Sequence, residues 1–438
     1  MRQIWLALAL FGFVFAKPLD FSIISKGPKD SKKNDAPTAL VIGGIQGDEP
    51  GGFNAVNIFL NHYRITKGRV LAISVLNRHS MLVNSRGLYG DMNRKFNLIE
   101  PSDPEFELVN RIKKLILDSK IDIIFHLHDG GGFYRPTFES QIANPNRWGA
   151  CSIIDQEDLE GAKFPHLGAL SKAIISHINA HLLRPNERYY TRNTKTAEGN
   201  TEMEKALTYY AIRHKKSAIA SEASKNLDLQ TRVYYHLLAL EALFNEIGIG
   251  FERDFKLDPK VLYRLINDKS LDVTIANSIK LPLFGLKSEL MYFPLPMNYK
   301  NDVENIKLAS NSHILGLSDR KNEVFLKYGN RLQTKLKPIY LDFDKDIKTA
   351  DFIIDGKAQS VQIPSVIKVK KTFEVMPQNG IRVNVIGFVG SKKSEAGYKI
   401  SKNMLQNRFA IDRSDVMYRV EFYKDEKFAG MVIVDFNK

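Results

Sequence analysis

Polar side chains that can bind a metal or activate water follow three apolar runs of the sequence. A glycine-rich segment after the first run places Gln46 and Glu49 three residues apart. A later run ends with His126 and His128, and a third run ends with Glu222. Imidazole, carboxylate and amide groups are ligands or proton carriers in metal-assisted hydrolysis.

Three of these residues form a candidate zinc site. A catalytic zinc ion typically takes three protein ligands of nitrogen or oxygen type and keeps a fourth position for water. Side chains three residues apart lie on one side of a helical turn, which brings Gln46 and Glu49 together. His128 is nearer the strand end than His126. We therefore expect one zinc ion held by Gln46, Glu49 and His128, with His126 as a supporting or core residue.

These residues can form one site only if strands and helices bring distant segments of the chain to one edge of a sheet. Short apolar runs rich in Val and Ile are typical of strands buried on both faces, and they occupy residues 39–42, 70–76, 121–127 and 217–220. Helical periodicity lies between and after them, at residues 52–61, 104–119, 167–181, 201–214 and 229–246. Thr201 and Glu204 predict a capping box for the fourth helix. The alternation predicts an α/β fold with a mostly parallel mixed sheet flanked by helices, and ligands bind such sheets beyond the carboxyl ends of the strands.

The last part of the chain has a different pattern. Apart from a helix-like stretch at 258–266, its segments alternate apolar and polar residues, as strands with one solvated face do. Examples are residues 271–281, 324–326, 381–385 and 418–423, the last leading into a predicted hairpin that ends at 436. We expect three domains after a signal peptide: an α/β domain at 17–249, a small β-rich domain at 250–338 and an immunoglobulin-like β-sandwich at 339–438.

Taken together, these features resemble the zinc carboxypeptidases of the funnelin type. That family combines a His-x-x-Glu pair, an arginine, an Asn-Arg pair, a later histidine at a strand end and a glutamate base. This chain has the corresponding residues in the same order: Gln46 with Glu49, Arg86, Asn93 with Arg94, His128 and Glu222. The resemblance implies a zinc carboxypeptidase domain.

The resemblance also implies a role for each remaining residue. Glu222 is expected to take a proton from the attacking water and deliver it to the leaving amine. Arg86 is expected to stabilise the developing oxyanion. Asn93 and Arg94 are expected to hold the terminal carboxylate of the substrate, for which a planar guanidinium is well shaped, and this makes the enzyme an exopeptidase.

Gln46 stands where the family has histidine. An amide oxygen is a poorer zinc donor than an imidazole, so two interpretations stay open: a working enzyme with an unusual ligand, or a scaffold that only binds peptidoglycan. A deacylase of the succinyl-amino-acid type is a third alternative, against which the Asn93 and Arg94 pair argues.

Two further segments lie near the expected site. Residues 130–153 are rich in Gly, Pro and Asn, which predicts a loop at the rim of the cleft. Tyr209 and Tyr210 precede the last apolar run, and core packing is the favoured interpretation for both.

Bulk composition limits the setting in which the protein works. An apolar stretch after Arg2 that reaches Ala16 is typical of a cleaved signal peptide at 1–16, and no other segment is long and apolar enough to span a membrane. The single cysteine, Cys151, cannot form an internal disulfide. The net charge of +14 favours anionic partners, and for an exported protein we expect cell-wall polymer rather than nucleic acid.

Within the family, the chain resembles members that trim peptidoglycan and thereby affect cell shape. The resemblance implies a periplasmic enzyme that removes meso-diaminopimelate from the uncrosslinked muramyl tripeptide and leaves a dipeptide. The resemblance thus implies the peptidoglycan stem peptide as the substrate partner, and we expect the β-rich domains to be candidate surfaces for other cell-wall or cell-shape proteins.

Overall fold

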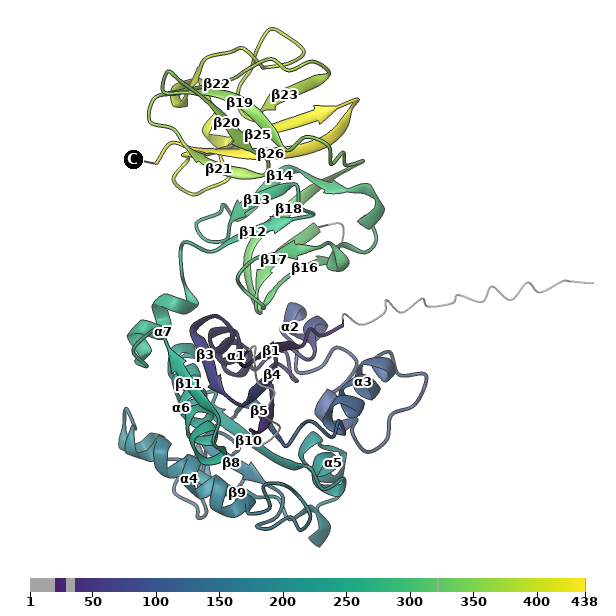
Figure 1. Cartoon of the computed structure of the whole chain (residues 1–438), viewed down its shortest axis with the longest axis vertical. Coiled ribbons are helices and arrows are strands. Elements are labelled where there is room, and N and C mark those ends of the chain that lie inside the picture. Colours follow the sequence, from purple (N-terminus) through teal and green to yellow (C-terminus); the bar gives the residue numbers. More distant parts are fainter. Residues whose placement is uncertain (1–19, 29–35, 321–322, 438) are drawn as a thin grey trace, which may run out of the picture.

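The computed structural model describes residues 20–28, 36–320 and 323–437. An α/β unit and two β-rich units are stacked along one long axis (Figure 1), which confirms the predicted fold class. The predicted signal peptide at 1–16 lies outside the described residues. In the described part of the chain, no helix has the length and apolar character that crossing a membrane requires.

The α/β unit is built on a seven-stranded sheet with the strand order β1-β4-β2-β5-β10-β8-β9. Its strands are β1 (Ile24–Lys26), β2 (Thr38–Ile42), β4 (Arg69–Ile73), β5 (Ile123–Gly130), β8 (Cys151–Ile154), β9 (Tyr190–Asn193) and β10 (Ser217–Ser224). The four strands predicted from apolar runs, β2, β4, β5 and β10, are parallel to one another. Strand β1 runs antiparallel to β4, and β8 runs antiparallel to β10. Both β5 and β10 are buried along their whole length, which explains why their sequences lack polar alternation.

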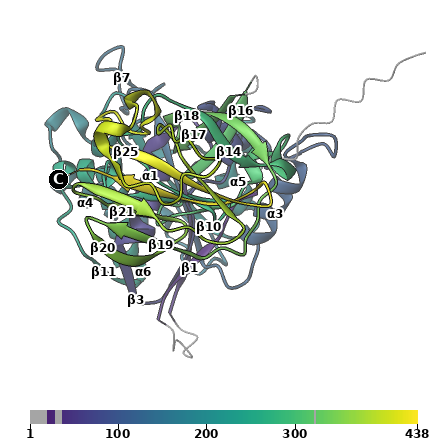
Figure 2. The same cartoon turned by 90° about the horizontal axis from the view of Figure 1, so that it is seen from above.

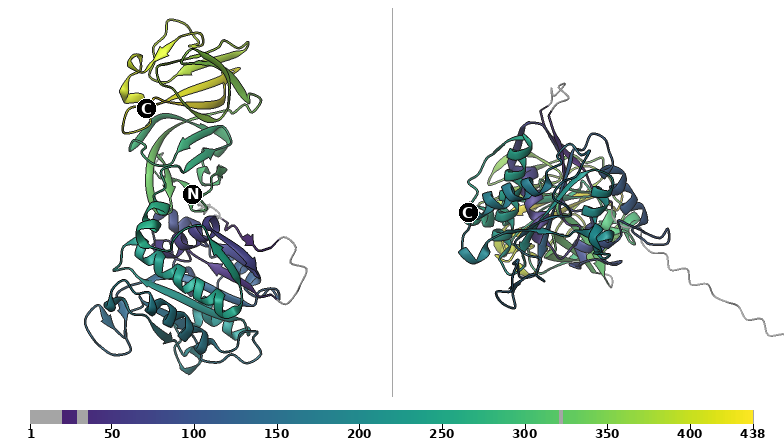
Figure 3. Two further views of the ribbon diagram at one scale, coloured as in Figure 1. Left: turned by 60° about the vertical axis from the view of Figure 1, so that its left-hand side comes forward. Right: turned by 90° about the horizontal axis from the view of Figure 1, so that it is seen from below.

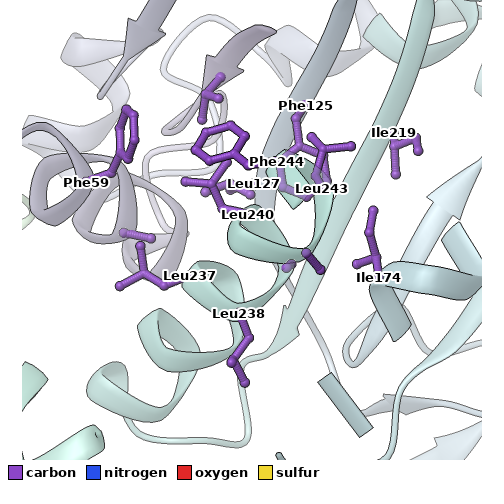
Figure 4. Packing of buried hydrophobic residues seen from close by; sticks show 14 of the residues in the cluster. Phe59, Phe125, Leu127, Ile174, Ile219, Leu237, Leu238, Leu240, Leu243 and Phe244 are labelled. Carbon is purple, nitrogen blue, oxygen red and sulfur yellow. The ribbon is translucent and has the colours of Figure 1, made fainter. Parts of the chain in front are cut away.

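Helices cover both faces of this sheet. They are α1 (Pro50–His62), α2 (Arg78–Val83), α3 (Phe106–Ile116), α4 (Leu167–Ala180), α5 (Leu207–Arg213), α6 (Leu229–Ile247) and α7 (Pro259–Ile266). Successive β2 residues enter opposite cores: Val41 packs with α1, α4 and α6, and Ile42 packs with α3 and α5. Figure 4 shows Phe244 of α6 beside Phe125 of β5. A two-stranded ribbon of β3 (Tyr63–Lys67) and β11 (Gly250–Arg253) lies beside this layer.

The structure corrects two predicted elements. The helix predicted at 201–214 is a 3₁₀ turn, Met203–Lys205, followed by α5, and no capping box forms at Thr201. The backbone is extended at Ala206, because the flanking residues bond to the 93–96 segment instead: Phe96 N donates to Lys205 O (2.9 Å) and Leu207 N to Asn93 Oδ1 (3.0 Å). The strand predicted at 271–281 is a hairpin, with its turn at two residues of positive φ.

The middle unit contains two small sheets. One has β13 (Ile279–Pro282), β12 (Asp272–Ile275) and β15 (Leu308–Ala309), and the other has β14 (Glu289–Pro296), β18 (Arg331–Leu341), β17 (Glu323–Tyr328) and β16 (Leu315–Arg320). The predicted junctions at 249–250 and 338–339 stay predictions. The helix after the first of them, α7, packs Leu262 and Ile266 into the core of the α/β unit.

The C-terminal unit is a sandwich of two four-stranded sheets that share one core. The sheets are β20 (Lys357–Gln362), β19 (Thr349–Ile354), β22 (Thr372–Val375) and β24 (Ile400–Ser401), and β21 (Ser365–Lys368), β26 (Lys427–Asp435), β25 (Met417–Lys424) and β23 (Ile381–Val385). The predicted hairpin ending near 436 is confirmed as the β25–β26 pair.

The middle unit shares its apolar core with both neighbours. Leu82 of α2 packs into this core, as do Phe428 and Ile433 of β26. Viewed from above (Figure 2) or below (Figure 3, right) the units overlap, and a view turned about the vertical axis shows the same stack (Figure 3, left). The three units therefore form one elongated molecule with the middle unit as the link.

Candidate active site

A cavity lies where the carboxyl ends of β2, β5 and β10 meet, the edge at which open parallel sheets bind ligands. The structure brings all seven predicted site residues into its lining: Gln46, Glu49, Arg86, Asn93, Arg94, His128 and Glu222. These residues come from four separate stretches of the chain. Only the sheet topology unites them.

The turn between β2 and α1 positions Gln46 and Glu49. Gly44 has a φ of +61°, and a Cβ on Gly47 would lie 2.1 Å from Ser80 O, so the turn is closely packed against α2. Pro50 begins α1, a position that needs no N–H donor. The turn thereby places two polar side chains, both buried, beside the end of β5.

The side chain of Gln46 has one hydrogen-bonded end and one free end. Its Nε2 donates to Asp91 Oδ1 at 3.0 Å, whereas its Oε1 is buried without a partner. A carboxylate can only accept hydrogen bonds, so Asp91 fixes which end of the amide faces it. The amide oxygen is therefore the end left for a cation.

Glu49 and His128 are the other two candidate metal donors. His128 Nδ1 lies 2.9 Å from Glu49 Oε2, and both side chains are almost fully buried. No cluster of three His, Cys, Asp or Glu side chains suited to a metal occurs in the described ranges. Glu49, His128 and the unpaired amide oxygen of Gln46 together form a set of three donors that fits a metal ion. A metal ion would also give this buried oxygen a partner, which buried oxygens normally have.

His126, itself bonded to Thr208, orients the imidazole of the candidate metal donor His128. His126 Nδ1 lies 2.7 Å from His128 Nε2, and His126 Nε2 lies 2.9 Å from Thr208 Oγ1. Burial, followed by the charge of Arg86, lowers the pKa of His128 to about 3, and burial also lowers the pKa of His126. Both rings are therefore neutral near pH 7. With the proton of His128 on Nε2 and directed to His126, its Nδ1 lone pair is free for a metal.

Two buried carboxylates face this cavity. Burial, and then the negative charge of Glu49, raises the pKa of Glu222, whose Oε2 has no hydrogen-bond partner. Burial, and then the charge of Asp129, raises the pKa of Glu49 to about 8. A divalent cation beside them supplies the positive charge that these carboxylates lack. Glu222 thus combines an unpaired oxygen with an environment that favours holding a proton.

The cationic side of the cavity is formed by the 84–94 segment. Arg86 donates from Nη1 to Glu49 Oε1 (3.3 Å) and from Nε to Asp91 Oδ2 (3.0 Å), yet its side chain is 50% exposed. Arg94 Nη1 donates to Asn93 O at 3.1 Å. Asn93 Oδ1 accepts from Leu207 N, which leaves its NH₂ group as a donor. A guanidinium and an amide side by side can bind a carboxylate in two places.

Several residues of the site were missed by sequence reasoning. Asp91 bonds to both Gln46 and Arg86, and Asp129 accepts from Gly51 N (2.7 Å), Arg232 Nη1 (2.8 Å) and His236 Nε2 (3.1 Å). Burial works against ionisation of Asp129, but the hydrogen bond from His236 and the charge of Arg232 outweigh it and lower its pKa. The spacing of Arg232 and His236 on one helical face was an available signal for such a pair.

The segment 130–153 only partly matches its predicted role as a rim. Gly130, Gly131 and Trp148 line the cavity, but the segment ends in β8, a buried strand paired with β10. Tyr210 packs against Phe96 in the core (ring centroids 6.1 Å apart). From the same helix it is Thr208 that reaches the cavity.

Three family models match consecutive parts of the chain. The catalytic part of the carboxypeptidase controlling helical cell shape matches residues 1–267. The β-barrel domain of the same carboxypeptidases matches residues 268–342, and the C-terminal domain of metallo-carboxypeptidase matches residues 343–437.

Solved structures of one protein resemble the whole molecule. The apo cell shape determinant protein Csd4 from Helicobacter pylori is 51% identical, with a TM-score of 0.92, over 95% of this chain and 100% of that chain. Its tripeptide-bound form gives 51% identity and a TM-score of 0.91 over the same shares. The mDAP-bound form of Csd4, described as a D,L-carboxypeptidase, gives 51% and 0.91 over 94% and 100%.

A curated relative matches a much shorter stretch. The N-alpha-acetyl-L-2,4-diaminobutyric acid deacetylase of Halomonas elongata is 30% identical over 108 residues, which is 23% of this chain and 30% of that protein. The match thus spans less than a third of the length of that relative.

Proposed function

Because this chain belongs to the family of carboxypeptidases controlling helical cell shape, we propose that it is a zinc-dependent D,L-carboxypeptidase of peptidoglycan. The reaction removes meso-diaminopimelate from the uncrosslinked muramyl tripeptide and leaves the dipeptide. One observation carries this assignment: a single cavity joins metal donors, a buried unpaired carboxylate and a cationic clamp. The tripeptide-bound and mDAP-bound forms of Csd4 support the choice of substrate.

Gln46, Glu49 and His128 would hold the zinc ion through Oε1, a carboxylate oxygen and Nδ1. Zinc bound there supplies Lewis acidity toward the scissile carbonyl and lowers the pKa of the attacking water. Asp91 keeps the amide oxygen of Gln46 directed to the cavity, and His126 keeps the His128 proton on Nε2.

Glu222 acts as the proton carrier of the reaction. Its carboxylate takes a proton from the attacking water and gives it to the leaving amine, so its pKa must lie high enough to return that proton. The buried, carboxylate-rich surroundings that raise this pKa support the assignment.

Arg86 and the Asn93–Arg94 pair bind the negative charges of the substrate. Half of the Arg86 side chain is exposed, which leaves donors for the oxyanion that develops in the transition state. Asn93 and Arg94 hold the carboxylate of the departing residue, which restricts cleavage to the end of the stem peptide.

The periplasm is the proposed location of this reaction, because the peptidoglycan stem peptide is found there. The net charge of +14 supports attraction to an anionic polymer.

Incubation of the purified protein with muropeptides tests this function. The zinc-loaded protein is expected to convert tripeptide to dipeptide, and Glu222→Gln is expected to lower kcat by about 100- to 10,000-fold while zinc content stays the same. Glu246→Gln, at an exposed position on α6, is the matched control and is expected to behave like the wild type. Tripeptide left intact by zinc-loaded protein would rule out the substrate, and full activity of Glu222→Gln would rule out its role.

A further inference from the structure

One cation in the cavity has no part in the reaction described above. Arg86, Arg94 and Lys225 are the basic side chains that line the cavity in the described part of the chain. Arg86 and Arg94 are engaged with the oxyanion and the departing carboxylate. Lys225 is left without a substrate group to bind.

Lys225 is held at the end of β10, three residues after Glu222. Its backbone N donates to Gly130 O at 2.8 Å, which ties it to the end of β5. Its Nζ lies 2.7 Å from Asp48 Oδ2 and 4.0 Å from Glu49 Oε1, with the side chain 32% exposed. An ammonium group has three donors, and among the described residues only Asp48 is within hydrogen-bonding distance. Donors therefore remain for a ligand.

The cavity is unobstructed at Gly131, a residue close to Lys225 in the fold. A Cβ added at Gly131, which also lines the cavity, would meet nothing within 4 Å. Gly131 follows the residue to which the Lys225 backbone is bonded. The cavity wall next to the backbone of Lys225 therefore leaves a ligand free to approach from the β5 end.

The chemistry of the tripeptide provides a matching anion. The residue before the scissile bond is D-glutamate joined through its side-chain carboxyl, so its main-chain carboxylate is free. Four carbon–carbon bonds separate that carboxylate carbon from the scissile carbonyl carbon, a reach of about 5 Å. Lys225 Nζ lies 4.0 Å from an oxygen of Glu49, a proposed metal donor, so it lies within comparable reach of the reacting centre.

We propose that Lys225 binds the free carboxylate of the γ-linked D-glutamyl residue and so selects substrates in which that group is ionised. The inference rests on the proposed function and extends it to the residue on the amino side of the scissile bond. In a partly desolvated cavity, the lysine ammonium group binds an ionised carboxylate more strongly than a neutral amide. Substrates amidated at this carboxylate are expected to react more slowly.

Paired substrates test this proposal. Zinc-loaded enzyme is assayed on L-Ala-γ-D-Glu-mDAP and on the D-isoglutaminyl analogue that carries an amide instead of the carboxylate. The wild-type ratio of kcat/KM is expected to favour the carboxylate about 10- to 100-fold. Lys225→Met is expected to bring this ratio close to 1, and Lys225→Arg to retain most of it. Asp48→Asn, which releases Lys225 from its ion pair, is expected to raise the ratio.

Lys163→Met is the matched control, since Lys163 pairs with Asp122 and does not line the cavity. Because both substrates meet the same enzyme sample, partial loss of zinc or of folded protein cancels from each ratio. A wild-type ratio near 1, or an unchanged ratio in Lys225→Met, would overturn the inference while leaving the proposed function intact. Failure of zinc-loaded wild type on both substrates would instead overturn the proposed function.

Discussion

At the scale of single residues, Asp91 would account for how the proposed ligand Gln46 can serve where the funnelin-type zinc carboxypeptidases have histidine. A free amide can turn either its oxygen or its NH₂ group toward a cation, and only the oxygen binds. Asp91 accepts the NH₂ group and so removes the unproductive orientation. The same carboxylate bonds to Arg86 and to Asn93 N (2.9 Å), so one side chain positions the proposed metal ligand, the proposed oxyanion donor and the proposed clamp.

Asp91→Asn is expected to weaken zinc binding by about 10- to 100-fold, the usual effect of losing a residue that orients a metal ligand. The neutral asparagine can donate as well as accept, so it no longer selects the orientation of Gln46. Competition with a chromogenic chelator measures the affinity. Asp254→Asn, at an exposed position paired with His62, is the control, and equal affinity of the two variants would contradict the argument.

The pH profile of kcat/KM is expected to show an acid limb above the ordinary glutamate pKa of about 4.3. Burial and the charge of Glu49 raise the pKa of Glu222, so its base form is lost at a higher pH than usual. Activity therefore falls as pH decreases through that raised value. The profile is recorded with zinc content measured at each pH, and a limb at or below 4.3 with zinc retained would argue against Glu222 as the base.

Some of the candidate site was accessible because its chemistry follows a recognisable strand end, and Arg86, Asn93 and Arg94 were accessible through the resemblance to the funnelin-type carboxypeptidases. Gln46, Glu49, His128 and Glu222 were accessible from the strand ends. Asp91 was accessible in neither way, because its hydrogen bond to Gln46 joins positions 45 residues apart through tertiary folding. Short-range patterns contain no information about such a contact.

At the scale of elements, the turn from β2 into α1 is closely packed against its neighbours. Gly51 N donates to Asp129 Oδ2, and a Cβ at this position would lie 2.2 Å from Asp129 Oδ1. The start of α1 can approach β5 this closely only without a side chain.

Gly51→Ala is expected to lower the free energy of unfolding by about 1–3 kcal/mol, the usual cost of forcing extra volume into a packed site. Gly131→Ala is the matched control, because its Cβ meets no atom within 4 Å, and its stability is expected to stay within about 0.5 kcal/mol of the wild type. Denaturant unfolding followed by circular dichroism measures both. Equal stability of the two variants would show that the turn relaxes.

Elements were predictable where local pattern and tertiary environment agree. The buried strands β2, β5 and β10 consist of apolar runs, and α6 keeps its helical periodicity over its full length. Strand β8 was missed because it follows a stretch rich in Gly, Pro and Asn. The helix predicted at 201–214 is shortened because tertiary hydrogen bonds to the 93–96 segment replace its first turns.

At the scale of the whole molecule, a buried arginine of the C-terminal unit is hydrogen-bonded to the middle unit. Arg419 of β25 donates from Nη1 to Tyr292 O (3.1 Å) and from Nη2 to Met291 O (3.0 Å). Its Nη1 also lies 3.3 Å from Glu421 Oε1, and both side chains are 4% exposed. The ion pair lies within β25, and the two hydrogen bonds of Arg419 connect the sandwich to β14 of the middle unit.

Arg419→Ala is expected to lower the free energy of unfolding by about 3–5 kcal/mol, because it leaves a buried carboxylate unpaired. Burial already raises the pKa of Glu421 against the lowering effect of Arg419, so the pKa rises further in the variant. A carboxyl group with a raised pKa in the folded state favours folding below its unfolded pKa and loses that contribution as pH rises. The stability deficit is therefore expected to grow between pH 5 and pH 8.

Thermal unfolding across this pH range measures the deficit, with Arg408→Ala at an exposed position as the control. Turnover of the tripeptide is expected to stay at the wild-type level in folded Arg419→Ala, since the residue lies outside the cavity. A deficit that shrinks as pH rises would contradict the assignment of Glu421.

The serial arrangement of the units also has a geometric consequence on a polymeric substrate. The middle unit shares its core with α2 on one side and with β26 on the other, so neither junction is a free linker. Any contact that the terminal sandwich makes with a glycan strand then stands at a set distance from the cleavage cavity. A strand held by the sandwich would then be cut at positions offset from that contact by a length built into the fold.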